Sequence, residues 1–261
     1  MQVIWAASSN PTVLKTKRRF VPFIAGSFVA VVLILAAHAQ VRLDSNLPRT
    51  SDGKPILTAP APKTSDGKPD LSGIWRVVSD KYLRNLAADN IQVPFTPAAA
   101  VLYKERQNNS GKGRPSDRCL PRGVPAALLV RDHPWKIVQA PGEILILYDE
   151  SLHHRQIFLD GRGFPEDTTP TWFGYSIAKW EGDSLVAETI GFNEETWIDD
   201  GGHPHSNEMH VIERFRRPTV GTLEAEITIN DQKTYTKPWT ATVLFELLPD
   251  SDLGESVCGV N

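Results

Sequence analysis

The sequence is poor in cysteine and carries no excess of basic residues. It has 2 cysteines in 261 residues and no CxxC motif, which excludes a cysteine-dense scaffold and disfavours a redox or thiolate metal site. The formal net charge of −3 disfavours a nucleic-acid partner, because such proteins carry a basic footprint. No heptad run or collagen period occurs, and a charged fraction of 23% is ordinary for a folded domain.

Residues 1–39 contain the three parts of a secretory signal peptide. A basic stretch at 17–19 precedes an apolar run over 20–37, and Ala37-His38-Ala39 fits a small-residue cleavage site. The apolar run is also long enough to span a bilayer, so an uncleaved N-terminal anchor is the alternative, and it would be the one contact with a membrane. Both interpretations place the folded part in the periplasm or outside the cell.

Residues 40–70 are rich in proline and repeat one hexapeptide. TSDGKP occurs at 50–55 and again at 64–69, which favours an exposed linker before a folded domain at 71–261. The two cysteines, Cys119 and Cys258, both lie in that domain. In an oxidising compartment we expect them to form a disulfide that ties the C-terminal tail to a loop.

The folded domain shows the period-two hydrophobicity of β-strands. Apolar and polar residues alternate over 223–229 and 239–247. Further strands are expected near 73–78, 135–140, 143–150, 154–160, 173–180, 184–190 and 209–217. Strands joined mostly by tight turns predict an all-β fold, an antiparallel meander closed into a lipocalin-like barrel of about 8–9 strands, because closure removes exposed edges. One insertion follows the first strand, with a helix from Thr96-Pro97 to about Asn108.

Gly73-Ile74-Trp75 on the first strand resembles the G-x-W signature of lipocalin-type barrels. That resemblance implies a Trp75 that closes the barrel floor and a late-strand arginine that covers it, for which Arg214 and Arg216 are candidates. The segments DLSGIW, RQIFLDGR, WEGDSL and GHPHS are similar to a family of exported bacterial proteins of unassigned function. This second resemblance covers most of residues 69–261 and implies no particular activity.

Histidines concentrate in the stretch 196–217. His203 and His205 alternate on an extended segment, and with His210 or Asp199 they could hold a divalent metal with an open water position. The alternative is a polar loop with surface histidines. Either histidine could also serve as a general acid or base near neutral pH.

A second group of candidates lies on or beside the middle strands. Arg155, Asp160 and Arg162 could bind a carboxylate or hydroxyl group, or the Asp–Arg pair could merely fix a turn. The aromatic residues Tyr175, Trp180 and Trp197 could wall a pocket, or belong to the core. Glu188 is a candidate general base if its strand face is inward, and a solvated side chain if the face is outward.

These features predict an exported barrel with one small-molecule pocket for a small aromatic or hydroxylated compound. As an enzyme it would use His203, His205, Asp160 and Glu188 for hydrolysis, elimination or isomerisation, with a divalent metal as a possible cofactor. The alternatives are a non-catalytic carrier of an apolar ligand and an envelope structural or interaction protein. Convergence of those polar residues in one cavity would favour the enzyme, and their dispersal would favour the carrier.

Overall fold

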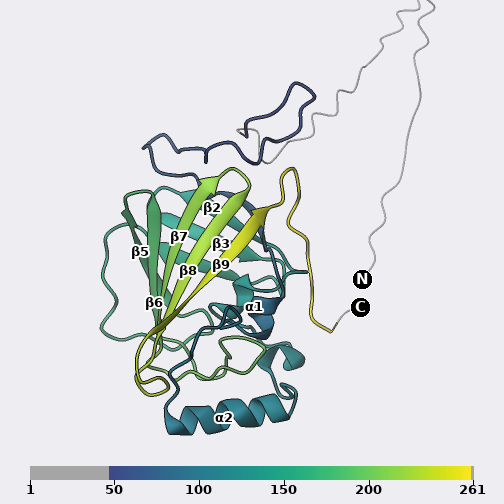
Figure 1. Cartoon of the computed structure of the whole chain (residues 1–261). Helices are drawn as coiled ribbons and strands as arrows, with labels where there is room; N and C mark the ends of the chain where they lie inside the picture. The colour runs from purple at the N-terminus through teal and green to yellow at the C-terminus, as the bar shows by residue number, and fades with distance from the viewer. Residues whose placement is uncertain (1–46, 260–261) are drawn as a thin grey trace, which may run out of the picture. The chain divides into compact units, whose positions relative to one another are not determined.

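The computed structural model describes residues 47–259, in which nine strands form a closed barrel in chain order (Figure 1). The predicted signal peptide or anchor lies outside the described residues. The strands are β1 (Gly73–Val77), β2 (Trp135–Ala140), β3 (Glu143–Tyr148), β4 (His154–Phe158), β5 (Tyr175–Glu181), β6 (Ser184–Ile190), β7 (His210–Thr219), β8 (Thr222–Asn230) and β9 (Trp239–Leu247). The predicted all-β barrel is confirmed.

One junction departs from the expected antiparallel meander. Strands β4 and β5 pair in parallel, through Ile157↔Ser176 and Phe158↔Ile177, whereas the other neighbours in the barrel are antiparallel. Their connection, residues 159–174, exceeds the dozen or so residues that a parallel return needs. The chain therefore comes back to the end at which β4 began before β5 starts.

Alternation along the strands fills the inside of the barrel with side chains. In β9, residues 239, 241, 243, 245 and 247 are buried, and those between them are exposed or half-buried. Large side chains occupy the interior, and Trp135 meets Phe245 edge-on at 5.1 Å between ring centroids. A barrel of this strand number is narrow enough to be packed in this way.

Trp75 is fully buried and an arginine covers it, but the arginine is not one of the two expected. The guanidinium carbon of Arg217 lies 4.9 Å from the Trp75 ring centroid. Arg214 and Arg216 instead project outward and pair with Glu181 and Glu224. The expectation was wrong by one residue because inward positions on β7 are the odd-numbered ones.

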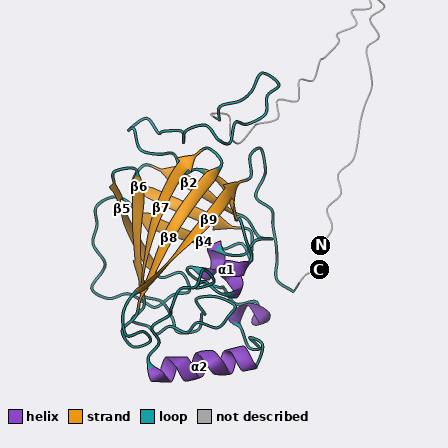
Figure 2. Ribbon diagram, viewed as in Figure 1, coloured by secondary structure: helices purple, strands orange, loops and turns teal. Residues whose placement is uncertain are grey.

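The insertion after β1 contains two α-helices, α1 (Lys81–Arg84) and α2 (Pro97–Asn108), and two short 3-10 helices, η1 (Pro115–Arg118) and η2 (Ala126–Leu128). The helix expected from Thr96-Pro97 is confirmed, and the Thr96 side chain accepts a hydrogen bond from the backbone N–H of Ala99. Figure 2 shows α2 beyond one end of the barrel strands, and α1 nearer to the strands. Phe95, just before α2, forms a β-bridge with Tyr235 in the loop between β8 and β9. Residues 47–259 contain no helix long and apolar enough to cross a membrane.

The described part of the predicted linker contacts the barrel. Both hexapeptide copies form the same turn, in which Gly53 N–H donates to Thr50 O and Gly67 N–H to Thr64 O, at 2.9 Å each. Between the copies, Ala59 O accepts from Val220 N–H at 2.9 Å, which attaches the segment to the β7–β8 turn.

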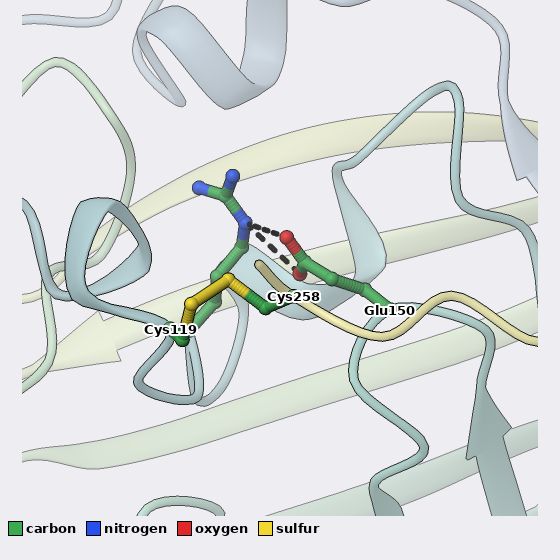
Figure 3. The surroundings of a disulfide bond; sticks show 4 residues. Cys119, Glu150 and Cys258 are labelled. Atoms are coloured by element: carbon green, nitrogen blue, oxygen red, sulfur yellow. Dashed lines mark hydrogen bonds and ion pairs between the residues drawn. A yellow bond between two sulfur atoms is a disulfide. The ribbon is translucent and has the colours of Figure 1, made fainter. Parts of the chain in front are cut away.

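The predicted disulfide between Cys119 and Cys258 is confirmed (Figure 3). Beside it, the tail forms a parallel bridge between Ser256 and Glu150. The disulfide thus ties the C-terminal tail to the insertion between β1 and β2, and the Ser256–Glu150 bridge holds the tail against the loop that follows β3.

Candidate functional site

Most of the sequence-predicted site residues lie in separate parts of the barrel, although Arg155 and Tyr175 line one pocket. They occupy the inner wall (Arg155, Trp180), the outer surface near β4 and β5 (Asp160, Arg162, Tyr175), the outer faces of β6 and β7 (Glu188, His210), and the loop between β6 and β7 (Trp197, His203, His205). An acid–base site that combines these residues is therefore not assembled.

His203 is a buried structural residue, not the surface histidine of the polar-loop alternative. Its Nδ1 lies 2.6 Å from Asp199 Oδ2, and the side chain is 1% exposed. The ring stacks on Tyr103 of α2, with centroids 4.4 Å apart, and on Phe95 at 5.5 Å. Asp199 Oδ2 also accepts from the backbone N–H of Leu86 at 2.7 Å. This dyad joins the β6–β7 loop to the helical insertion.

His205 lies in different surroundings. Its Nε2 is 2.6 Å from Thr196 Oγ1, and its Nδ1 is 3.0 Å from Ser206 O. Because a carbonyl can only accept, the neutral ring donates from Nδ1 and accepts the Thr196 hydroxyl at Nε2. Burial lowers the pKa of His205 below its ordinary value, which keeps the ring neutral.

The predicted metal ligands His203, His205 and His210 are not brought together. Both ring nitrogens of His205 are engaged within the protein, and His210 Nε2 lies 3.1 Å from Glu188 Oε2 on the outer face. In residues 47–259, no group of three or more His, Cys, Asp or Glu side chains is arranged to hold a metal ion. Each histidine ring lies in a different environment because the loop is rich in turns. Their spacing in the sequence therefore did not predict which of them lie together in the structure.

Glu188 faces outward, which is the second of the two orientations that the sequence left open. It pairs with His210 across the β6–β7 ladder, and its side chain is 34% exposed. Parity explains the outcome, because Leu185, Ala187 and Thr189 take the inward positions of β6. Glu188 is therefore not the buried carboxylate that a general base inside the barrel requires.

Asp160 and Arg162 form the turn-fixing pair. Arg162 donates from Nε to both Asp160 oxygens at 2.8 Å, and its backbone N–H donates to Asp160 Oδ1 at 3.2 Å. The Arg162 hydrogen bond lowers the pKa of Asp160. The guanidinium also lies over Phe158 at 3.8 Å, with Tyr175 Oη within 3.4 Å of Nη1.

Arg155 is the predicted binding residue with the most unusual position, because it lies inside the barrel with 2% exposure. Its Nε donates to Ser176 Oγ at 3.0 Å and its Nη2 to Thr189 Oγ1 at 2.7 Å. Nη2 also donates to Glu213, whose side chain is 0% exposed. Burial alone lowers the pKa of Arg155, but the charge of Glu213 and hydrogen bonds with Glu213 and Tyr148 raise it above its ordinary value, so the guanidinium stays charged.

One polar atom of this interior cluster remains unpaired. Within the described chain, Glu213 Oε1 is buried without a hydrogen-bond partner, whereas the Tyr148 hydroxyl and the Arg155 guanidinium interact with each other. Tyr148 lies near enough to interact electrostatically with Arg155 and Glu213, and burial raises its pKa. Buried polar groups are normally satisfied, so an unpaired carboxylate oxygen on a fully buried ion pair is unusual.

A pocket of about 370 Å³ adjoins the cluster at the β4–β5 junction. Its lining comes from both edges of the junction and the loop before β5: His154, Arg155, Gln156, Phe158, Thr171, Trp172, Phe173, Gly174, Tyr175 and Ser176. Arg155 and Ser176 belong to both the pocket and the cluster. Phe173 connects them further, because it stacks on Tyr148 with centroids 5.2 Å apart.

The pocket lies where the parallel ladder stops. Continuing the register from Ile157↔Ser176 would pair 155 with 174 and 156 with 175, and all four of these residues line the pocket. Gly174 has a φ of +66°, and a Cβ there would lie 2.6 Å from Ile190 O. The chain turns at this glycine in a conformation that other residues rarely adopt, and the described β4–β5 ladder begins only after it, at Ile157↔Ser176.

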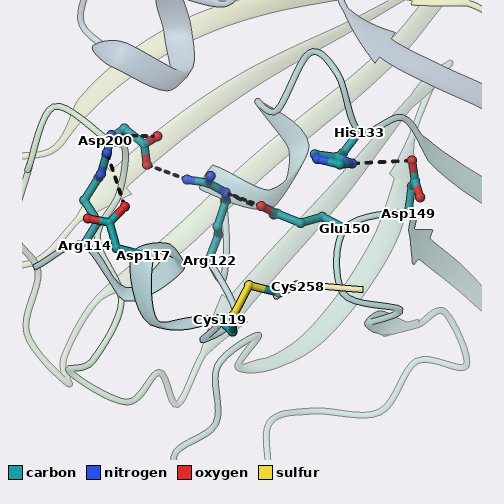
Figure 4. A network of polar contacts seen from close by, with 9 residues as sticks. All are labelled: Arg114, Asp117, Cys119, Arg122, His133, Asp149, Glu150, Asp200 and Cys258. Atoms are coloured by element: carbon teal, nitrogen blue, oxygen red, sulfur yellow. Dashed lines mark hydrogen bonds and ion pairs between the residues drawn. A yellow bond between two sulfur atoms is a disulfide. The ribbon is translucent and has the colours of Figure 1, made fainter. Parts of the chain in front are cut away.

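A second hollow, of about 440 Å³, lies at the helical end of the barrel. Its three arginines are already paired, Arg84 with Asp80, Arg114 with Asp200 and Arg131 with Glu246. Figure 4 shows the network continuing from Asp200 through Arg122, whose Nε lies 2.9 Å from Glu150 Oε1. These pairs join the insertion to the β6–β7 loop and leave the hollow less suited to a ligand.

Sequence reasoning missed four members of the interior cluster: Tyr148, Ser176, Thr189 and Glu213. One signal was present, because Glu213 stands between Val211 and Phe215 at an inward position of β7. A charged residue at an inward position needs a buried partner. Arg155 also points inward, because it shares a strand face with the buried Ile157 on β4.

A scan against protein-family models finds no match, and a search of curated proteins finds no significant one.

Proposed function

We propose that the chain is an exported, non-catalytic barrel protein that binds a small aromatic or hydroxylated compound in the pocket at the β4–β5 junction. The observation that carries the proposal is the coincidence of this pocket with the buried Arg155 cluster. A pocket with aromatic walls and a few convergent polar groups is the usual form of a small-molecule site. Its volume of about 370 Å³ suits a single-ring compound.

Binding is favoured over catalysis by the dispersal of the acid–base candidates. His203 and His205 are held by internal partners, and Glu188 faces outward. A carrier in the lipocalin manner would hold its ligand inside the barrel, but here Trp135 and Phe245 belong to a tightly filled interior. The wall pocket is therefore the better candidate.

Export is supported by two features. The pattern of residues 1–39 is that of a signal peptide or anchor, and the Cys119–Cys258 disulfide suits an oxidising compartment. We therefore propose a periplasmic or secreted location.

The test is ligand-observed NMR with 4-methylbenzyl alcohol as the probe and the disulfide-intact protein. Gln156→Trp places a large ring in the pocket lining, and Thr242→Trp makes a similar change at an exposed position on β9. We expect saturation transfer to the probe with the parent protein and with Thr242→Trp, and its loss with Gln156→Trp. A signal that is absent from the parent or unchanged in Gln156→Trp would refute the proposal.

A further inference from the structure

We infer that the pocket at the β4–β5 junction recognises a peptide-like unit, the N–H and C=O of one aromatic amino-acid residue, through the main chain of His154. This inference rests on the proposed function, because it names the chemical class of compound that the same pocket binds. It follows from the direction of the main-chain groups along β4 and from the point at which the β4–β5 ladder stops.

The β3–β4 ladder determines which residues of β4 direct their main chain toward β5. Tyr148 N–H donates to His153 O at 2.9 Å, and Leu159 N–H donates to Gly142 O at 2.8 Å. In an antiparallel ladder, residues bonded to the partner strand alternate with residues whose N–H and C=O point the other way. The odd-numbered residues of this register therefore bond to β3, and the N–H and C=O of His154 point toward the side of β5.

His154 has no strand beside it on that side. The described β4–β5 ladder joins residues 157–158 to residues 176–177, and so begins further along β4. Across the gap, the N–H groups of residues 172–174 donate to no acceptor in the part of the chain that the structure describes. One donor and one acceptor on the same residue are thus open to the pocket, which His154 lines.

One residue of an extended peptide matches this donor and acceptor. Two residues that face each other as a hydrogen-bonded pair of an antiparallel ladder exchange both of their N–H···O bonds. The N–H of the ligand would donate to His154 C=O, and its C=O would accept from His154 N–H. Such main-chain bonding at a strand edge is a general mode of peptide recognition, in which pockets for the side chains give specificity.

The pocket lining favours an aromatic side chain on that residue. Directly opposite residues of a ladder have their side chains on the same face of the sheet, and His154 shares the outer face of β4 with Phe158. The Phe158 ring lies against Tyr175, with centroids 5.3 Å apart, and both residues line the pocket together with Trp172. An aromatic ring therefore has other rings to pack against.

The first experiment compares two probes that differ in one group. N-acetyl-L-phenylalanine methylamide carries the N–H that we assign to His154 C=O, and its ester analogue, (S)-2-acetoxy-N-methyl-3-phenylpropanamide, has an oxygen in place of that N–H. Dissociation constants are measured by NMR titration of the disulfide-intact protein. We expect the amide to bind roughly tenfold more tightly than the ester, because the ester loses one hydrogen bond and sets an oxygen against the carbonyl. Equal or tighter binding of the ester would overturn the inference.

Two variants at one position test the main-chain donor. His154→Pro removes the N–H, whereas His154→Ala removes the same side chain and keeps the N–H. Proline is tolerated at the first residue of a strand, and His154 begins β4 with its N–H directed away from β3. We expect the proline variant to bind the amide probe roughly fivefold more weakly than the alanine variant does. Equal affinities of the two folded variants would contradict the role of the N–H, and if the proline variant does not fold, the comparison of amide and ester on the parent protein decides the matter.

The outcomes separate this inference from the proposed function. Failure of both 4-methylbenzyl alcohol and the amide probe to bind, or binding that Gln156→Trp leaves unchanged, refutes the pocket itself. Binding of the alcohol without the amide, or equal binding of amide and ester that Gln156→Trp abolishes, keeps the pocket and refutes recognition through the main chain of His154.

Discussion

Replacing one partner of the Arg155–Glu213 pair should destabilise the barrel far more than replacing both. Arg155→Met leaves the Glu213 carboxylate at 0% exposure without its cation. Removing one member of a buried ion pair costs about 3–5 kcal/mol, because the remaining charge stays desolvated. Glu213→Leu leaves the guanidinium of Arg155 in the corresponding position and should cost a similar amount.

The double variant Arg155→Met/Glu213→Leu removes both charges and keeps side chains of similar volume. Ser176 and Thr189 lose Arg155 as a donor, but their hydroxyl oxygens already lie 3.0 Å apart and can bond to each other. We therefore expect the double variant to be only about 0–2 kcal/mol less stable than the parent. The coupling between the two sites should then exceed about 3 kcal/mol.

The assay is urea unfolding followed by tryptophan fluorescence, with the disulfide intact in all four proteins and the slopes compared as a check on two-state behaviour. Additive losses, with the double variant as unstable as the sum of the two single variants, would show that the pair is not coupled. A loss below about 1 kcal/mol in Arg155→Met would show that the pair is not a buried one.

Three further predictions concern other parts of the barrel. The free energy of unfolding should fall as pH decreases below about 6.5. Burial lowers the folded-state pKa of His205, so the unfolded chain takes up the proton at a higher pH than the folded one does. Urea melts from pH 7.5 to 5 should show a smaller fall in the His205→Gln variant than in the parent protein. Trp75→Ala should cost about 3–5 kcal/mol in urea melts, because the ring is fully buried beneath Arg217, and a loss below about 1 kcal/mol would contradict this. Replacing Cys119 and Cys258 by alanine should cost about 2–5 kcal/mol, since the bond closes a loop over a sequence separation of 139; calorimetry giving an unchanged Tm would refute it.

Strand periodicity was sufficient to predict much of the barrel, because period-two patterns are local. Residues 239–247 show this, since each apolar position of the pattern is buried. Periodicity does not predict which strands pair with each other. The parallel junction of β4 and β5 depends on the path of residues 159–174, and no local pattern encodes that path.

The candidate site was harder to predict because its residues meet only through the barrel. Arg155 was chosen for its nearness to Asp160 in the sequence, yet its partners Thr189 and Glu213 come from β6 and β7. The loop that contains His203 led to the opposite error. Its many polar residues predicted a catalytic or metal site, whereas the His203 ring bonds to Asp199 and stacks on Tyr103, which attaches the loop to α2.

The location of the proposed pocket follows from the way in which the barrel closes. A filled barrel offers a ligand little room inside, so access to its interior polar groups requires an interruption in the wall. The antiparallel β5–β6 ladder joins seven residue pairs, from Tyr175↔Ile190 to Glu181↔Ser184, whereas the described β4–β5 ladder joins two. Arg155 lies on β4 just before that short ladder begins, beside the position where Gly174 turns the chain aside. The parallel return that sequence reasoning missed therefore also accounts for the pocket, and Arg155, one member of the buried ion pair, is among the residues that line it.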